Sequence, residues 1–134
     1  MFDCFLDVIE ATKCKYINVG GDEWWHSPDK GVKPSEFLPG GKTRSEAFLE
    51  FFQEAAKFGR KHHVKILTHE DMINPYHNGT RYDNYKIVDK LPKQDIIILP
   101  WSCKDQGIKY FNKKGFTQWA NPTGVWFPKK TVGM

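Results

Sequence analysis

The stretch Ile96-Ile97-Ile98-Leu99-Pro100 decides the fold class of this chain. It is apolar throughout and shows no alternation with polar residues, which is typical of a strand buried on both faces of a parallel sheet. Working outward, we expect further strands at 15–19, 64–68 and 116–120, and helices at 2–11, 43–61, 82–91 and 105–114. Helices and strands that alternate in this way predict an α/β fold, in which right-handed crossovers join parallel strands.

The segment before the second strand carries two signals. Thr43 and Glu46 form a T-x-x-E capping box, which predicts the start of an amphipathic helix. Residues 24–43 are rich in Pro, Gly, Ser and Lys and show no periodicity. A connection of this length inside a compact domain is usually functional.

Composition excludes several classes of protein. The chain has 134 residues, 40% of them hydrophobic, which suits one domain of ordinary size and is too few for two. No apolar run approaches the roughly 18 residues of a membrane span, and the N-terminus lacks the basic start of a signal peptide, so we expect no membrane partner and assign no compartment. The 20 basic residues are dispersed among 16 acidic ones, which disfavours nucleic acid as a partner. The three cysteines fit neither a disulfide framework nor a zinc knuckle.

Residues that can bind or react follow each expected strand. The four strands are followed in turn by Gly20-Gly21-Asp22-Glu23-Trp24, His69-Glu70-Asp71, Trp101-Ser102 and Asn121-Pro122. The carboxyl ends of parallel strands meet at one edge of the sheet, where the βα loops open. Aromatic residues make up 15% of the chain, and several of the five Trp lie beside Pro, Gly or charged residues, as rings that line a binding surface do. The sequence therefore predicts a site at this edge.

Asp22 and Glu23 are the candidate catalytic pair. Neighbouring residues of a regular strand point to opposite faces, but Gly20 and Gly21 allow the backbone to turn and to bring both carboxylates to the rim. Two carboxyl groups in an aromatic-lined cleft suit acid/base work on a glycosidic bond. A solvated acidic turn is the alternative that these residues leave open.

The segment Tyr16-Ile17-Asn18-Val19-Gly20-Gly21-Asp22-Glu23 resembles the strand-four signature of glycoside hydrolase family 20, the β-N-acetylhexosaminidases. The chain is also similar to that family in the helix before this segment, the capped helix after it, and the segments 65–72, 91–101 and 108–116. In order, these correspond to helix three through strand seven of the family's barrel. The resemblance implies a partial (β/α)8 TIM barrel of about four βα units.

Four strands cannot close a barrel, which typically takes ~250 residues. We therefore expect residues 1–134 to be a fragment of a single glycoside hydrolase catalytic barrel and to be inactive alone. Self-association of two copies to complete a barrel is the alternative.

The resemblance implies hydrolysis of terminal N-acetyl-β-hexosaminides by a retaining, substrate-assisted mechanism, without a cofactor or a metal. Glu23 would protonate the leaving oxygen and later deprotonate the attacking water, while the carbonyl oxygen of the substrate's 2-acetamido group acts as the nucleophile. Asp22 would accept the acetamido N–H and stabilise the positive charge of the oxazolinium-type intermediate. The expected contacts with the carbohydrate are Gly21, Trp24, His69, Asp71, Trp101, Asn121 and Trp126.

Two positions depart from the family pattern. His69 stands where the family usually has a tryptophan, and Trp126 lies nearest to the place of a tyrosine that donates to the acetamido oxygen. These departures favour the alternative of a non-catalytic carbohydrate-binding barrel. A more distant alternative is the GGDEF domain of diguanylate cyclases, in which a similar string lies on a β-hairpin. A metal site at His69, Glu70, Asp71 and His77 fits no established ligand spacing.

Overall fold

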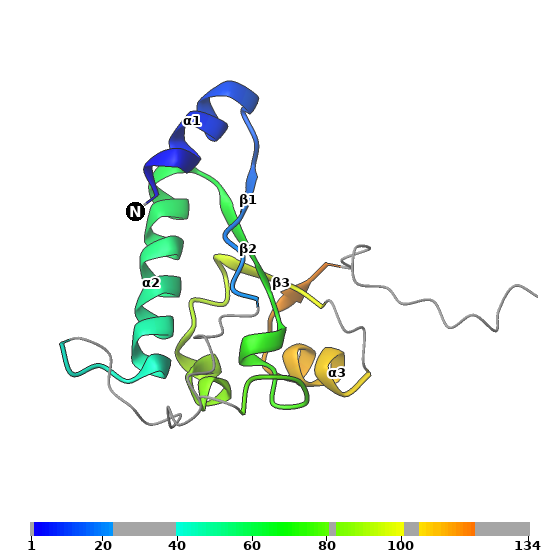
Figure 1. Ribbon diagram of the computed structural model, residues 1–134. Helices are drawn as coiled ribbons and strands as arrows, with labels where there is room; N and C mark the ends of the chain where they lie inside the picture. The colour runs from blue at the N-terminus through cyan, green and yellow to red at the C-terminus, as the bar shows by residue number, and fades with distance from the viewer. Residues whose placement is uncertain (1, 23–39, 81–82, 101–104, 120–134) are drawn as a thin grey trace, which may run out of the picture.

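The computed structural model describes residues 2–22, 40–80, 83–100 and 105–119. Within these ranges the chain forms α-helices, β-strands and two 3₁₀ helices labelled η (Figure 1). Their bounds are α1 Asp3–Thr12, β1 Tyr16–Asn18, α2 Arg44–His62, β2 Lys65–His69, η1 Asp71–Ile73, η2 Asn84–Lys90, β3 Ile96–Leu99, α3 Asp105–Lys113 and β4 Thr117–Gln118. The alternation of helices and strands agrees with the order that the sequence predicts.

The strands form one parallel sheet, and its spatial order, β1-β2-β3-β4, is also their order along the chain. Ile17 pairs with Ile66, Ile66 with Ile96, and Ile98 with Gln118. The predicted α/β class with a parallel sheet is therefore confirmed. Each crossover steps to the next strand in the same direction.

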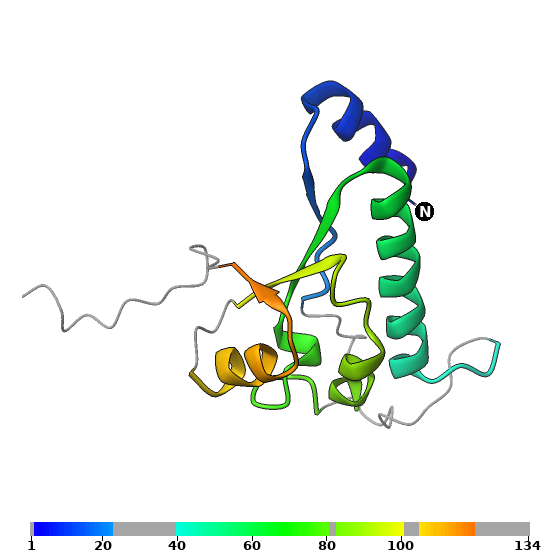
Figure 2. The same ribbon diagram turned by 180° about the vertical axis from the view of Figure 1, so that it is seen from behind.

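One face of the sheet forms the hydrophobic core with the helices. Ile66, Ile96 and Ile98 point to this face and are completely buried. The core also includes Phe48, Phe52 and Ala55 of α2, Met72 and Ile73 of η1, Ile87 and Val88 of η2, Phe111 of α3, and Phe116, which precedes β4. In both views α2 and α3 flank the strands, and α1 lies across the carboxyl-terminal end of α2 (Figures 1 and 2).

The sheet curls toward its opposite face, which carries Tyr16, Ile97 and Leu99 and is called the curled face below. Ile97 and Leu99 point to this face and are also buried, so all four residues of β3 are buried, as its uninterrupted apolar sequence predicts. The ring of Tyr16 on β1 lies 4.5 Å from the ring of Trp119, centroid to centroid. Trp119 directly follows β4 and continues its ladder through a hydrogen bond from its N–H to the carbonyl of Ile98. The outermost strands of the sheet therefore approach each other across this face.

Helix α2 begins at the capping box that the sequence predicts. The Thr43 hydroxyl accepts a hydrogen bond from the Glu46 N–H, and the Glu46 carboxylate accepts one from the Thr43 N–H. The helix ends at His62, and the next residue, His63, caps it with a left-handed φ of 57°. Among the described residues, no helix is both long and apolar enough to cross a membrane.

The segment 82–91, expected to be a helix, differs in its detail. The described part forms the 3₁₀ helix η2 over only Asn84–Lys90. Asp83 precedes it with a left-handed φ of 59°, and Pro92 follows Leu91. With seven residues, η2 is longer than the roughly three or four that 3₁₀ helices usually have. The 3₁₀ helix η1 was not expected from the sequence.

Candidate functional site

The turn at the carboxyl end of β1 is built by two glycines. Gly20 and Gly21 have φ values of +76° and +91°, in the left-handed region that favours glycine. A Cβ on Gly21 would lie 2.4 Å from the Thr68 hydroxyl and 3.2 Å from the ring of Phe52. The backbone of Gly21 thus occupies a space that no side chain can share, between β2 and α2. The turn inferred from the glycine pair is present.

Hydrogen bonds fix Gly20 on both sides. Its N–H donates to Oδ1 of Asn18 over 2.9 Å. Its carbonyl accepts a bond from the Thr68 hydroxyl over 2.8 Å and another from the His69 N–H over 3.0 Å. The turn that carries Asp22 is therefore attached to the end of β2.

Asp22 follows this turn and is partly buried. Its carboxylate folds back toward the turn. Oδ1 of Asp22 lies only 3.5 Å from the position that a Cβ on Gly20 would take. The next residues, Glu23 and Trp24, lie outside the described residues. The position of Asp22 at the carboxyl edge of a parallel sheet is the place where α/β proteins commonly bind ligands.

His69 ends β2 beside Asn18 of β1. The Nδ2 atom of Asn18 lies 3.4 Å from Nε2 of His69. Both side chains belong to the curled face of the sheet, since Asn18 pairs with Leu67 and His69 lies two residues further along β2. No local pattern in the sequence predicts the roles of Asn18 and Thr68, because Asn18 contacts His69 and Thr68 contacts Gly20, each about fifty positions away.

Asp71 lies in a different place, below the surface. It is completely buried, and Nδ2 of Asn78 lies 3.4 Å from its Oδ2. The neighbouring carboxylate of Glu70, 1% exposed, accepts a hydrogen bond from Nδ2 of Asn74 over 2.5 Å and lies 3.5 Å from Nδ1 of His77. These contacts hold the loop after η1 against Glu70 and Asp71, which follow β2. The sequence predicts Asp71 at the rim of the site, and its contact with a ligand stays a prediction.

The structure thus brings Gly21, Asp22 and His69 together at one edge of the sheet. Trp101, Asn121 and Trp126 were also predicted for the site and lie outside the described residues, as Glu23 and Trp24 do. Within the described ranges, no group of three or more His, Cys, Asp or Glu side chains is arranged to hold a metal ion.

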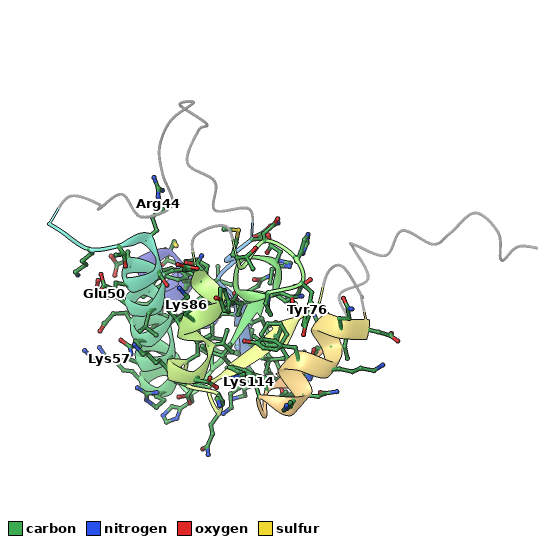
Figure 3. All side chains as sticks on the ribbon, turned by 90° about the horizontal axis from the view of Figure 1, so that it is seen from below. Arg44, Glu50, Lys57, Tyr76, Lys86 and Lys114 are labelled. Atoms are coloured by element: carbon green, nitrogen blue, oxygen red, sulfur yellow. The ribbon has the colours of Figure 1, made fainter. Side chains whose placement is uncertain are left out.

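A shallow cavity of about 390 Å³ lies elsewhere, between the loop after η1 and α3. It is lined by Tyr76, Gln106, Lys109, Tyr110, Lys113 and Lys114. Figure 3 shows Tyr76 beside α3. The cavity contains none of the predicted site residues.

The charges around this cavity are partly compensated. Lys114 donates a 2.5 Å hydrogen bond to Asp89, which lowers the pKa of the Asp89 carboxyl and raises the pKa of the Lys114 ammonium. Burial raises the pKa of the Tyr110 hydroxyl. Lys109 lies 3.7 Å from Asp105, and both side chains are highly exposed, so this pair contributes little.

Comparisons with known proteins found no relative. No protein-family model, no curated protein and no solved structure matches the chain.

Proposed function

We propose that the chain forms part of the (β/α)8 barrel of a retaining β-N-acetylhexosaminidase and carries its catalytic pair, Asp22 and Glu23. The substrate is a glycan with a terminal N-acetyl-β-hexosamine. This proposal takes its chemistry from the resemblance of residues 16–23 to glycoside hydrolase family 20.

Strand order supports the barrel. In a doubly wound sheet the strand order reverses at a switch point and helices cover both faces. Here the order is sequential, and the described helices α2 and α3 share a core on one face. The contact of Tyr16 with Trp119 on the other face agrees with a sheet that curls as a barrel wall does.

The observation that carries the proposal is the Gly20-Gly21 turn, which leads directly into Asp22 at the carboxyl end of a parallel strand. This is the edge at which barrel enzymes place their catalytic residues. The GGDEF alternative is disfavoured because that motif lies on a β-hairpin, whereas β1 pairs with β2 in parallel.

The proposed roles follow from the charge that develops during the reaction. Asp22 accepts the acetamido N–H, orients the acetamido oxygen toward the anomeric carbon and stabilises the cationic intermediate. Glu23 donates a proton to the departing oxygen and then removes one from water. His69 lies at the end of β2, the strand next to β1 in the sheet, and forms part of the wall that holds the sugar.

The proposal is tested with protein expressed from the complete gene and a chromogenic N-acetyl-β-glucosaminide. We expect hydrolysis, and we expect Glu23→Gln to lower kcat by about 10²- to 10⁴-fold, the usual contribution of a general acid/base. Glu54→Gln is the matched control, because Glu54 is an exposed carboxylate of α2 that is paired only with Lys57 among the described residues, and it should not change the rate.

Two outcomes would overturn the assignment. Unchanged hydrolysis by Glu23→Gln would show that another residue is the acid. If no N-acetylhexosaminide is cleaved while chitooligosaccharides still bind, the chain belongs to a carbohydrate-binding barrel, the alternative that His69 favours.

A further inference from the structure

The hydrogen bonds around Asn18 fix the orientation of its amide. A backbone N–H can only donate, so the atom of Asn18 that lies 2.9 Å from the Gly20 nitrogen is the oxygen, Oδ1. The other amide atom, Nδ2, therefore faces Nε2 of His69 over 3.4 Å. The amide cannot be turned around without placing two donors, Nδ2 and the Gly20 N–H, against each other.

This orientation in turn fixes the tautomer of His69. An amide NH₂ group can only donate, so Nε2 must be the accepting nitrogen of a neutral imidazole. The proton of the neutral ring then lies on Nδ1, because the hydrogen bond made by one ring nitrogen determines which nitrogen carries the proton. Whatever group lies against Nδ1 has to accept a hydrogen bond.

We propose that Asn18 is a positioning residue that couples the Gly20-Gly21 turn to His69 and holds His69 as the Nδ1–H tautomer. A single side chain thereby sets both the turn from which Asp22 projects and the donor that His69 presents. The assignment of the tautomer stands on hydrogen bonds alone, whereas the role in catalysis rests on the proposed function. Under that function, the imidazole of His69 lies where the family pattern has a tryptophan ring.

Asn18→Asp is the decisive variant. An aspartate has the same shape and still accepts the Gly20 N–H, so the turn is preserved. Its second oxygen, however, faces Nε2 as an acceptor, so the proton of the neutral ring must move to Nε2. Thr68→Val is the matched control, because it removes a different hydrogen bond to Gly20 and leaves the amide of Asn18 against His69.

The measurement is the ¹⁵N spectrum of the histidine rings at a pH at which the imidazoles are neutral, with the His69 signals assigned from a His69→Gln variant. We expect Nε2 of His69 to be pyridine-like and Nδ1 pyrrole-like in the unmodified protein and in Thr68→Val, and the two to exchange character in Asn18→Asp. A pyrrole-like Nε2 in the unmodified protein, or a tautomer unchanged by Asn18→Asp, would overturn the proposal.

Activity measurements on the same variants separate this inference from the proposed function. If the tautomer exchanges and hydrolysis falls in Asn18→Asp while the exposed control Glu54→Gln keeps full activity, Asn18 positions a residue that the reaction needs. If the tautomer exchanges while the unmodified protein cleaves no N-acetylhexosaminide, the proposed function is wrong and the coupling of Asn18 with His69 stands. If the tautomer exchanges and the rate of an active enzyme does not change, the positioning role is contradicted.

Discussion

Tyr16 and Trp119, at the two outer edges of the sheet, lie ring against ring with their centroids 4.5 Å apart. The planes of the rings are tilted by 58°, and each side chain keeps about two fifths of its surface exposed. Beneath them lie Ile97 and Leu99, which are buried on the same face. The contact therefore lies across the curled face of the sheet and joins the two edges of the four strands that the described residues form.

We expect this contact to be measurable in a double-mutant cycle. Tyr16→Leu and Trp119→Leu should show a coupling free energy of about 0.5–1.5 kcal/mol, the range of a tilted aromatic pair. Unfolding in urea provides the three free-energy differences. Tyr16→Leu combined with Tyr76→Leu is the control, because Tyr76 contacts Tyr110 instead. Additivity of the first pair to within about 0.3 kcal/mol would contradict the curled sheet.

Gly21→Ala should destabilise the protein more than Gly40→Ala. Both glycines have a φ close to +90°, so alanine meets a similar backbone strain of about 1–2 kcal/mol at each position. A Cβ on Gly21 also collides with the Thr68 hydroxyl at 2.4 Å, whereas a Cβ on Gly40 meets nothing within 4 Å. The free energies of unfolding of the two variants test this difference. Equal losses would show that the end of β1 is not packed as described.

Thr43→Ala should lower the free energy of unfolding by about 1 kcal/mol, because the cap of α2 loses the acceptor for the Glu46 N–H. Thr43→Ser keeps the hydroxyl and should retain most of the stability. Thermal unfolding followed by circular dichroism measures both variants. Two variants of equal stability would argue against the capping box.

The same cap predicts a dependence on pH. Hydrogen bonds from the backbone N–H and the hydroxyl of Thr43 hold the pKa of the Glu46 carboxyl below its ordinary value of 4.5. The folded state therefore favours the ionised form, so this contribution to stability is complete above the ordinary pKa and is lost as the pH falls through the lowered one. A ¹³C titration of the carboxyl should give a midpoint below 4.5 that moves upward in Thr43→Ala. A midpoint that is the same in both proteins would contradict this prediction.

Much of the fold was predictable because its signals are local. The apolar run at 96–100 identifies the buried strand β3, and the capping box identifies the start of α2 to within one residue. The segment over Asn84–Lys90 was less predictable, since an apolar pattern alone does not separate a short 3₁₀ helix from an α-helix. Asp83, which precedes this segment, has a left-handed backbone that no local sequence pattern predicts.

The site was predictable only in part. The glycine pair predicts a turn, and the turn is present. Gly21 fits there because it has no side chain to collide with Thr68 and Phe52. The partners that hold the turn are remote in sequence, since Thr68 and His69 bind Gly20 from a strand that begins more than forty residues later. Asp71 follows the same strand as His69 but turns inward with η1, so its place in the sequence did not reveal its burial.

The central claim is that Asp22 serves a reaction in which the substrate's own acetamido group is the nucleophile. The most direct measurement is the ratio of kcat/KM for a chromogenic N-acetyl-β-glucosaminide to that for the matching β-glucoside, in the protein expressed from its complete gene. We expect cleavage of the acetamido sugar only, with Asp22→Asn lowering its kcat by about 10²- to 10³-fold, as the loss of an electrostatic stabiliser does. Comparable cleavage of the plain glucoside, or an Asp22→Asn variant with full activity, would contradict the account.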